Sequence, residues 1–350
     1  MTTSLFIATH PRSTSTALER AFLTRTGLSG DSDKNNSADT ICIHEPFGEP
    51  FYYGPERMSD RFPAPACAKV ADTYPHELRY SDVVAEIDRQ HAQEGKPIVV
   101  IKDMAQYIVT PRASGRSDMI IDESFFSNDG GLTEVESECS SSSNDDNTST
   151  ASAGKRKVVV LIRAPHLSVP SYYRCCIPPL SARTGFDFYD PDEAGYRELR
   201  ILYDRLSSSG DGDNAPLIVD SADLIRSPRQ VIQRVCEHAG IDFRESMLHW
   251  EENSPQEQEL FQKWNGFHDD ALNSRGFKQE QKPSATNAAA EKTTKTASSK
   301  PADAEFEVDY DKWTADWSKK FNPEQVAEIR SAVERNLDDY LYLRQFCEQF

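Results

Sequence analysis

The distribution of apolar residues along the chain predicts five short, buried strands. Each run is four to six residues long, is aliphatic or β-branched, and in most cases is followed by polar or turn residues. Continuous apolar runs of this length are typical of parallel strands that are covered on both faces. The predicted strands are 5–9, 41–44, 97–102, 157–162 and 216–220.

The segments between these runs carry helix signals. A capping residue precedes Pro at Asp190, Ser227 and Asn322, with Glu or Gln three positions after each cap. Residues 80–95 also predict a helix, closed by Gly95. The alternation of helices and strands favours a doubly wound α/β fold. The last helix carries one apolar stripe, formed by Val326, Ile329, Val333, Leu337, Tyr340 and Leu341.

Two polar stretches interrupt this pattern in a chain of 350 residues that is 37% hydrophobic. Residues 127–154 are rich in Ser, Asn and acidic residues and contain no Lys or Arg, whereas residues 278–304 are rich in Ala, Lys, Thr and Ser. Neither stretch buries enough apolar surface to offset the entropy of ordering. We therefore expect one domain over residues 1–350, with disordered insertions at 127–156 and 278–304.

Charge and cysteine usage narrow the class of protein. The formal net charge of -18 makes nucleic acid an unsuitable partner, because binding it requires a basic face. The seven cysteines form no CxxC pair, which is typical of reduced, cytosolic thiols. The apolar stretch at residues 5–8 is too short for a signal peptide, and no segment approaches the ~20 apolar residues that cross a bilayer. These features predict a cytoplasmic protein with no membrane partner.

The first strand leads into a candidate anion site. A polar loop follows the strand, and the next helix has Ala17, Leu18, Ala21 and Phe22 on its expected buried side. Backbone N–H groups at such a helix start, together with the helix dipole, favour a bound anion. A Walker A loop is absent, since the loop has no Gly and no Lys before its last Thr, which disfavours an ATP kinase or GTPase. An ordinary hydroxyl-rich turn is the alternative. The candidate anion-binding residues are Pro11, Arg12, Ser13, Thr14, Ser15 and Thr16.

A second candidate anion site follows the strand at 157–162. Arg163 comes directly after that strand, and Ser171 lies eight residues later, on the next predicted helix. Both side chains could reach one phosphate at the carboxyl edge of the sheet, where ligands of α/β proteins bind. The alternative is a surface Arg and an unrelated helix Ser.

The segment HPRSTST, at residues 10–16, resembles the 5′-phosphosulfate loop of the sulfotransferase superfamily, usually written PRSGTT or PKSGTT. Thr14 stands where Gly is common in that family. Arg163 and Ser171 resemble the family's 3′-phosphate site, and Arg275 is a weaker match to a late Arg-Gly loop. The resemblance implies a P-loop-type three-layer fold and 3′-phosphoadenosine 5′-phosphosulfate as co-substrate, with no metal ion.

Sulfuryl transfer needs a cation at the leaving group and a base near the acceptor hydroxyl. Arg12 stands where the family often has a Lys that stabilises the leaving phosphate. Some branches of the family place a carboxylate base after the second strand, which makes Glu45 the first candidate base and His44 the second. Other relatives place a His after the third strand, where this chain has Gln106, which cannot act as a base. Lys102 is a candidate contact to the transferring group.

Segments 44–59 and 101–107 resemble a sulfotransferase-like branch found largely in fungi and plants. The resemblance implies an enzyme that transfers a sulfuryl group to a small-molecule hydroxyl, as in secondary-metabolite biosynthesis. The alternatives are sulfation that promotes elimination or cyclisation, a non-catalytic nucleotide-binding regulator, and a kinase dependent on ATP and Mg²⁺. The sequence selects neither the acceptor nor an oligomeric state. An acceptor pocket or simple core packing would account for the aromatic residues Phe47, Phe51, Tyr52, Tyr53, Tyr172 and Tyr173.

Overall fold

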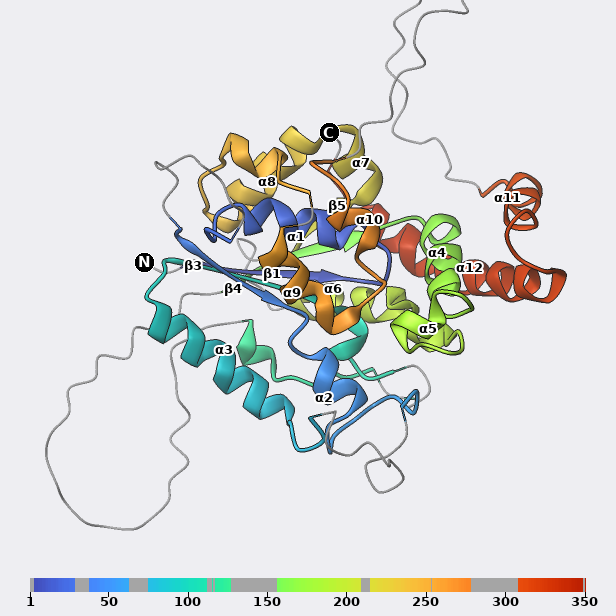
Figure 1. The fold of residues 1–350 in the computed structure, drawn as a ribbon, viewed down its shortest axis with the longest axis horizontal. Coiled ribbons are helices and arrows are strands. Elements are labelled where there is room, and N and C mark those ends of the chain that lie inside the picture. Colours follow the sequence, from blue (N-terminus) through green and yellow to red (C-terminus); the bar gives the residue numbers. More distant parts are fainter. Residues whose placement is uncertain are drawn as a thin grey trace, which may run out of the picture.

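A single five-stranded sheet forms the centre of the protein (Figure 1). All its strand pairs are parallel, in the order β2-β3-β1-β4-β5. The strands are β1 (Thr3–Thr9), β2 (Thr40–His44), β3 (Ile98–Met104), β4 (Arg156–Ile162) and β5 (Leu217–Asp220). The structure, a computed structural model, describes residues 3–28, 38–62, 75–111, 115, 117–126, 156–208, 215–252, 254–277, 308–348 and 350. All five predicted strands are confirmed, with ends shifted by at most two residues.

Alternating side chains of β1 fill two hydrophobic layers. Leu5 and Ile7 point into one cluster, and Phe6 and Ala8 into the other. Successive side chains of a strand point to opposite faces, so a run that is apolar throughout requires cover on both sides. The three-layer α/β fold predicted from the sequence, with a parallel sheet flanked by helices, is therefore confirmed.

Helices cover both faces of the sheet (Figure 1). The helices α1 and α8 pack on one face, and α2, α3 and α6 on the other, whereas α4, α11 and α12 share a third apolar cluster. The helices in the described ranges are α1 (Ser15–Leu23), α2 (Gly48–Tyr52), α3 (Tyr80–Glu94), α4 (Pro165–Cys175), α5 (Ser181–Thr184), α6 (Tyr196–Ser208), α7 (Ser221–Arg226), α8 (Pro228–Ala239), α9 (Pro255–Leu260), α10 (Asp269–Leu272), α11 (Tyr310–Trp317) and α12 (Pro323–Arg344).

The helix signals were correct in most places. Gly95 ends α3 in the left-handed conformation, at φ 60°. Asn322 caps α12 with a capping box, and Val326, Ile329, Val333 and Tyr340 of its predicted stripe are buried. One prediction was wrong: Asp190 caps only a 3-10 turn, Pro191–Ala194. Gly195, at φ 79°, then redirects the chain, so α6 begins after it.

The two predicted insertions fall largely outside the described residues, which exclude 127–155 and 278–307. Arg156, the last residue assigned to the first insertion, is instead the first residue of β4. Its guanidinium is buried and donates to the carbonyl of Phe125, so this end of the strand is ordered by a side-chain contact. Within the described residues, no helix combines the length and apolar character that a bilayer crossing requires.

Candidate functional site

The loop after β1 has the backbone shape of an anion-binding turn, formed without glycine. Arg12 and Thr14 adopt positive φ angles of 62° and 79°. Thr14 is the N-cap of α1, and its carbonyl accepts from the N–H groups of Ala17 and Leu18 at 3.1 and 3.3 Å. A left-handed residue other than Gly costs about 1–2 kcal/mol. Thr14 therefore keeps the conformation for which Gly is better suited, at a cost in strain.

Hydrogen bonds join this loop to the end of β4. The backbone N–H of Arg163 donates to His10 Nε2 at 3.0 Å, and Arg163 Nη1 donates to the carbonyl of Arg12 at 2.9 Å. His10 Nδ1 faces the carbonyl of Pro11 at 3.0 Å. Burial is the main cause that lowers the pKa of His10 to about 3, so this ring is neutral at pH 7. The two loops predicted as separate anion contacts thus form one bonded unit at the carboxyl edge of the sheet.

Arg12 connects this unit to α4 and α10. Its Nε donates to Ser171 Oγ at 2.9 Å, and its Nη2 pairs with Asp270 Oδ2 at 3.0 Å. Its Nη1 donates to the carbonyl of Phe267. Ser171 therefore contacts Arg12, whereas the sequence paired it with Arg163. Two guanidinium groups converge here, and burial lowers the pKa of Arg163.

Four buried ionisable residues lie beside the loop: three are at the ends of β2 and β3, and Glu19 is on α1. Lys102 Nζ bonds to Glu45 Oε1 and lies 3.4 Å from Glu19 Oε2. Glu19 in turn accepts from His44 Nδ1 at 2.9 Å. Burial is the largest single influence and would raise the pKa of Glu45, but Lys102, His44 and Lys263 together outweigh it and keep that pKa below its usual value. Glu45 is consequently an ionised carboxylate at neutral pH.

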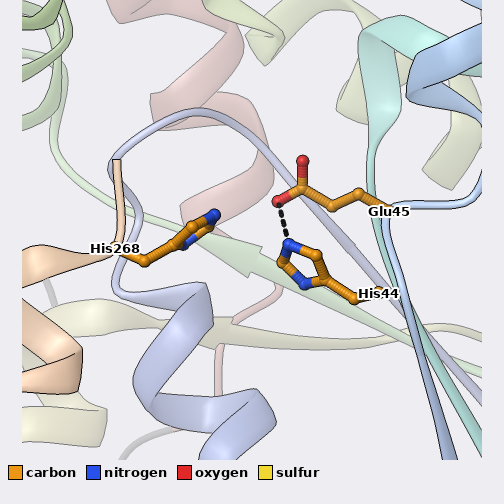
Figure 2. Close-up of side chains that lie close together, drawn as sticks. All are labelled: His44, Glu45 and His268. Carbon is orange, nitrogen blue, oxygen red and sulfur yellow. Dashed lines mark ion pairs between the residues drawn. The ribbon is translucent and has the colours of Figure 1, made fainter. Parts of the chain in front are cut away.

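His268, which is distant in sequence from the other members, also belongs to this cluster (Figure 2). Its Nδ1 bonds to Thr16 Oγ1 at 2.9 Å, and its Nε2 has no hydrogen-bond partner among the residues that the structure describes. His44 Nε2 also has none, and it lies 3.9 Å from Glu45 Oε1. Burial, with the nearby positive charges, lowers the pKa of His268 well below its ordinary value. Two histidines and a carboxylate thus converge, a grouping that the sequence did not predict.

A small cavity opens between the loop and a group of aromatic side chains. Its volume is about 60 Å³. Pro11, Arg12, Thr14, Ser15, Thr16, Glu45 and His268 form the polar side of its wall. The aromatic side is formed by Tyr52, Tyr107, Tyr172, Phe186, Trp264 and Phe267. The arrangement suits a molecule with one anionic end and one apolar end.

The predicted aromatic residues divide between this cavity and the core. Tyr52 and Tyr172 line the cavity. Phe47, Phe51 and Tyr53 belong to the main core cluster, and Tyr173 packs against Phe321 in the cluster of α4 and α12.

The structure brings most of the predicted polar residues together. The loop, Glu45, Lys102 and Arg163 all follow or end parallel strands, whose carboxyl ends meet at one edge. Arg275 does not join them, since it is exposed and pairs with Glu252 at 3.1 Å.

Sequence reasoning missed Glu19, His268 and Asp270. Glu19 lies three positions after Thr16 on α1, and that spacing places both on one side of the helix. His268 and Asp270 follow no recognisable motif, so no local signal pointed to them.

Residues 192–293 match the family model described as a sulfotransferase domain. The match supports a sulfotransferase relationship. It covers the segment that supplies Phe267, His268 and Asp270, but neither the loop after β1 nor Arg163.

Two known proteins are similar to parts of this chain. "Branched-chain-amino-acid aminotransferase-like protein 2" of Arabidopsis thaliana is 31% identical over 126 residues, which is 36% of this chain. The chain covers only 20% of that relative's length. Among solved structures, the sulfotransferase domain from the Synechococcus PCC 7002 olefin synthase shares 18% identity and a TM-score of 0.33, covering 70% of this chain and 76% of that one.

Proposed function

We propose that this protein transfers a sulfuryl group from 3′-phosphoadenosine 5′-phosphosulfate to a hydroxyl group of a small molecule. One observation carries the proposal: a helix-start loop with Arg12 lines an aromatic cavity that also contains an ionised carboxylate, and Arg163 is bonded to that loop. The sulfotransferase-domain match supports the same reaction class. The small size of the cavity supports a small acceptor, as in secondary-metabolite biosynthesis and in the fungal and plant branch that the sequence resembles.

In this proposal the phosphosulfate binds at the start of α1. The N–H groups of the loop and the hydroxyl groups of Ser15 and Thr16 face the anion, where the helix dipole is favourable. The hydroxyl group of Ser13 bonds to Thr9 instead, so this residue contributes its backbone N–H. The Arg12 guanidinium breaks its ion pair with Asp270 and stabilises the charge that develops on the leaving phosphate. Arg163, with Ser171, binds the second phosphate of the donor.

The acceptor enters from the aromatic side, and its hydroxyl oxygen attacks sulfur in line with the leaving phosphate oxygen. A new S–O bond forms to the acceptor as the S–O bond to the phosphate breaks, which releases 3′-phosphoadenosine 5′-phosphate. Glu45 takes the acceptor proton, because it lines the cavity as a carboxylate. Lys102 keeps Glu45 ionised. His44, the second candidate base, directs its Nδ1 to Glu19 and acts as a neighbour of the base.

Donor binding is tested first, by calorimetric titration with 3′-phosphoadenosine 5′-phosphate in parallel with ATP. We expect the bisphosphate to bind more tightly, because only it presents one anionic group to each arginine. Arg12→Ala should weaken binding, whereas Arg330→Ala, an exposed arginine paired with Glu334, serves as the matched control. Equal affinity for both nucleotides would contradict the assigned donor.

Turnover is tested with labelled donor and a panel of phenols and alcohols. Glu45→Gln should lower kcat about 10²–10⁴-fold, the usual contribution of a general base, and leave donor affinity within a few fold. Arg12→Ala should lower kcat by about 10²-fold or more. An Arg12→Ala enzyme with undiminished turnover would remove this mechanism.

The alternative functions are distinguished by the same assays. A product that retains the added sulfo mass supports transfer, whereas loss of both the sulfo group and water supports sulfation-assisted elimination or cyclisation. Tight donor binding without turnover on any acceptor supports a non-catalytic nucleotide-binding regulator.

A further inference from the structure

The cluster of His44, Glu45 and His268 has the composition of a metal centre. One ligand atom from each residue lies within 4.8 Å of the other two, and all three residues are buried (Figure 2). We propose that these residues bind a divalent transition-metal ion, for which Zn²⁺ is the best-suited candidate. This inference goes beyond sulfuryl transfer, because it concerns a binding event that requires neither donor nor acceptor.

The first argument is the state of the two imidazole rings. His44 and His268 are 6% and 5% exposed, and within the described part of the chain the buried Nε2 atom of each has no hydrogen-bond partner. A buried ring nitrogen without a partner costs about 1–3 kcal/mol. Figure 2 shows the two rings directed toward the carboxylate of Glu45. A metal ion between them would satisfy both nitrogens at once.

The second argument is how the opposite ring nitrogens are held. His44 Nδ1 donates to the carboxylate of Glu19 at 2.9 Å, which leaves the lone pair of Nε2 directed at the cluster. His268 Nδ1 bonds to Thr16 Oγ1 at 2.9 Å. Metal-binding histidines characteristically donate their other N–H to a carboxylate or another oxygen, which orients the ring and raises its basicity. Both rings of this cluster have that outer partner.

The third argument is ligand chemistry. Two imidazoles and one carboxylate form a set found in catalytic zinc sites, which leave a fourth position open. Ligand distances of about 2.0–2.2 Å place the ligand atoms about 3.4 Å apart around a tetrahedral ion. His44 Nε2 and Glu45 Oε1 are already 3.9 Å apart, so small side-chain rotations close the site. Glu45 and His268 also line the cavity, which supplies the open position.

The nearest cation, Lys102, limits but does not prevent metal binding. Its ammonium bonds to Glu45 Oε1, and Glu19 Oε2 lies 3.4 Å from it. Two carboxylates thus face one ammonium. The other cations that act on the cluster, Lys263 and Arg12, pair with Glu49 and Asp270, so one carboxylate charge is left to favour a further cation. When the Glu45 carboxylate turns toward the metal, the Lys102 ammonium can pair more closely with Glu19.

Metal binding and proton acceptance compete for Glu45. A carboxylate bound to Zn²⁺ is a weak base, so an occupied site should suppress the transfer proposed above. This consequence rests on that proposed function, whereas the binding test below does not.

The test uses full-length protein that has been treated with a chelator and dialysed. Calorimetry with Zn²⁺ should show one equivalent bound, and Co²⁺ should give the visible d–d absorption of a four-coordinate site. His268→Ala and His44→Ala should each weaken binding at least tenfold. Thr16→Val, which removes the outer partner of His268 but none of the three proposed ligands, should weaken it about 10–100-fold.

The matched control is His249→Ala, an exposed histidine on a different surface, which should bind Zn²⁺ as the unaltered protein does. Circular dichroism of each variant establishes that it is folded before its affinity is compared. Absence of Zn²⁺ and Co²⁺ uptake by the unaltered protein would overturn the proposal. So would unchanged affinity in folded His268→Ala and Thr16→Val, or a thiolate-to-Co²⁺ charge-transfer band, which would assign the ion to cysteines.

Discussion

The hydrogen bonds of His10 make the stability of the protein depend on pH. This ring is fully buried, lies 4.1 Å from the ring of Tyr196, and accepts from the backbone N–H of Arg163 through Nε2. An accepting Nε2 requires the proton to sit on Nδ1, which faces the carbonyl of Pro11. Protonating Nε2 would therefore break the bond that joins the loops after β1 and β4.

The size and sign of the effect follow from the pKa of His10. That pKa is lowered from 6.5 to about 3, chiefly by burial, so the unfolded chain binds the proton first as the pH falls. Stability is fully present above about pH 6.5 and decreases as the pH falls toward 3. Between pH 7.5 and pH 5.0, this one group should remove about 2 kcal/mol from the free energy of unfolding.

The assay is denaturant unfolding at both pH values for the unaltered protein and for His10→Gln. Glutamine keeps an acceptor for the Arg163 N–H but does not titrate. His166, whose pKa burial lowers to about 4, contributes to the pH dependence of both proteins, so the difference between them isolates His10. We expect the unaltered protein to lose about 2 kcal/mol more than the variant. Equal losses would refute the neutral, accepting state of His10.

Three further substitutions test other parts of the structure. Asp270→Asn removes the carboxylate that pairs with Arg12; the Asp270 side chain is 70% exposed, so the pair is weak. Binding of 3′-phosphoadenosine 5′-phosphate should therefore tighten about 2–5-fold by calorimetry, whereas weaker binding would show that Asp270 assists donor binding. Glu257→Gln leaves the buried guanidinium of Arg20 without its 2.6 Å partner and should lower the free energy of unfolding by about 3–5 kcal/mol, which a loss under 1 kcal/mol would contradict. Thr14→Gly and Thr14→Ala both lose the hydroxyl, but only Gly relieves the positive φ, so denaturant unfolding should find the Gly variant more stable by about 1 kcal/mol; equal stability would argue against strain in the loop.

The site residues that the sequence predicted correctly are those placed by the parallel arrangement of the strands. The loop at residues 10–16, Glu45, Lys102 and Arg163 all lie at or just after the ends of apolar runs. Once those runs are recognised as parallel strands, their carboxyl ends must meet at one edge. Strand ends can be located from local composition, which is why these residues were found together.

In α1, the helix after the first strand, the amphipathic pattern predicts the buried apolar residues but not the buried charged ones. Amphipathic spacing predicted Ala17, Leu18, Ala21 and Phe22 as buried; the last three are, whereas Ala17 is half-buried. Glu19 and Arg20 are also fully buried, although their charge would place them in water. Their burial depends on partners that other segments supply, such as Glu257 for Arg20.

The sequence by itself determined the five strands, most helix starts and the position of the polar loop after β1, because each depends on residues that are neighbours along the chain. Only the tertiary structure decided the chemistry inside the site. Thr16 meets His268 across 252 positions, and Arg12 meets Asp270 across 258. Such contacts depend on the path by which a distant segment returns to the sheet edge, and the packing of the whole chain determines that path.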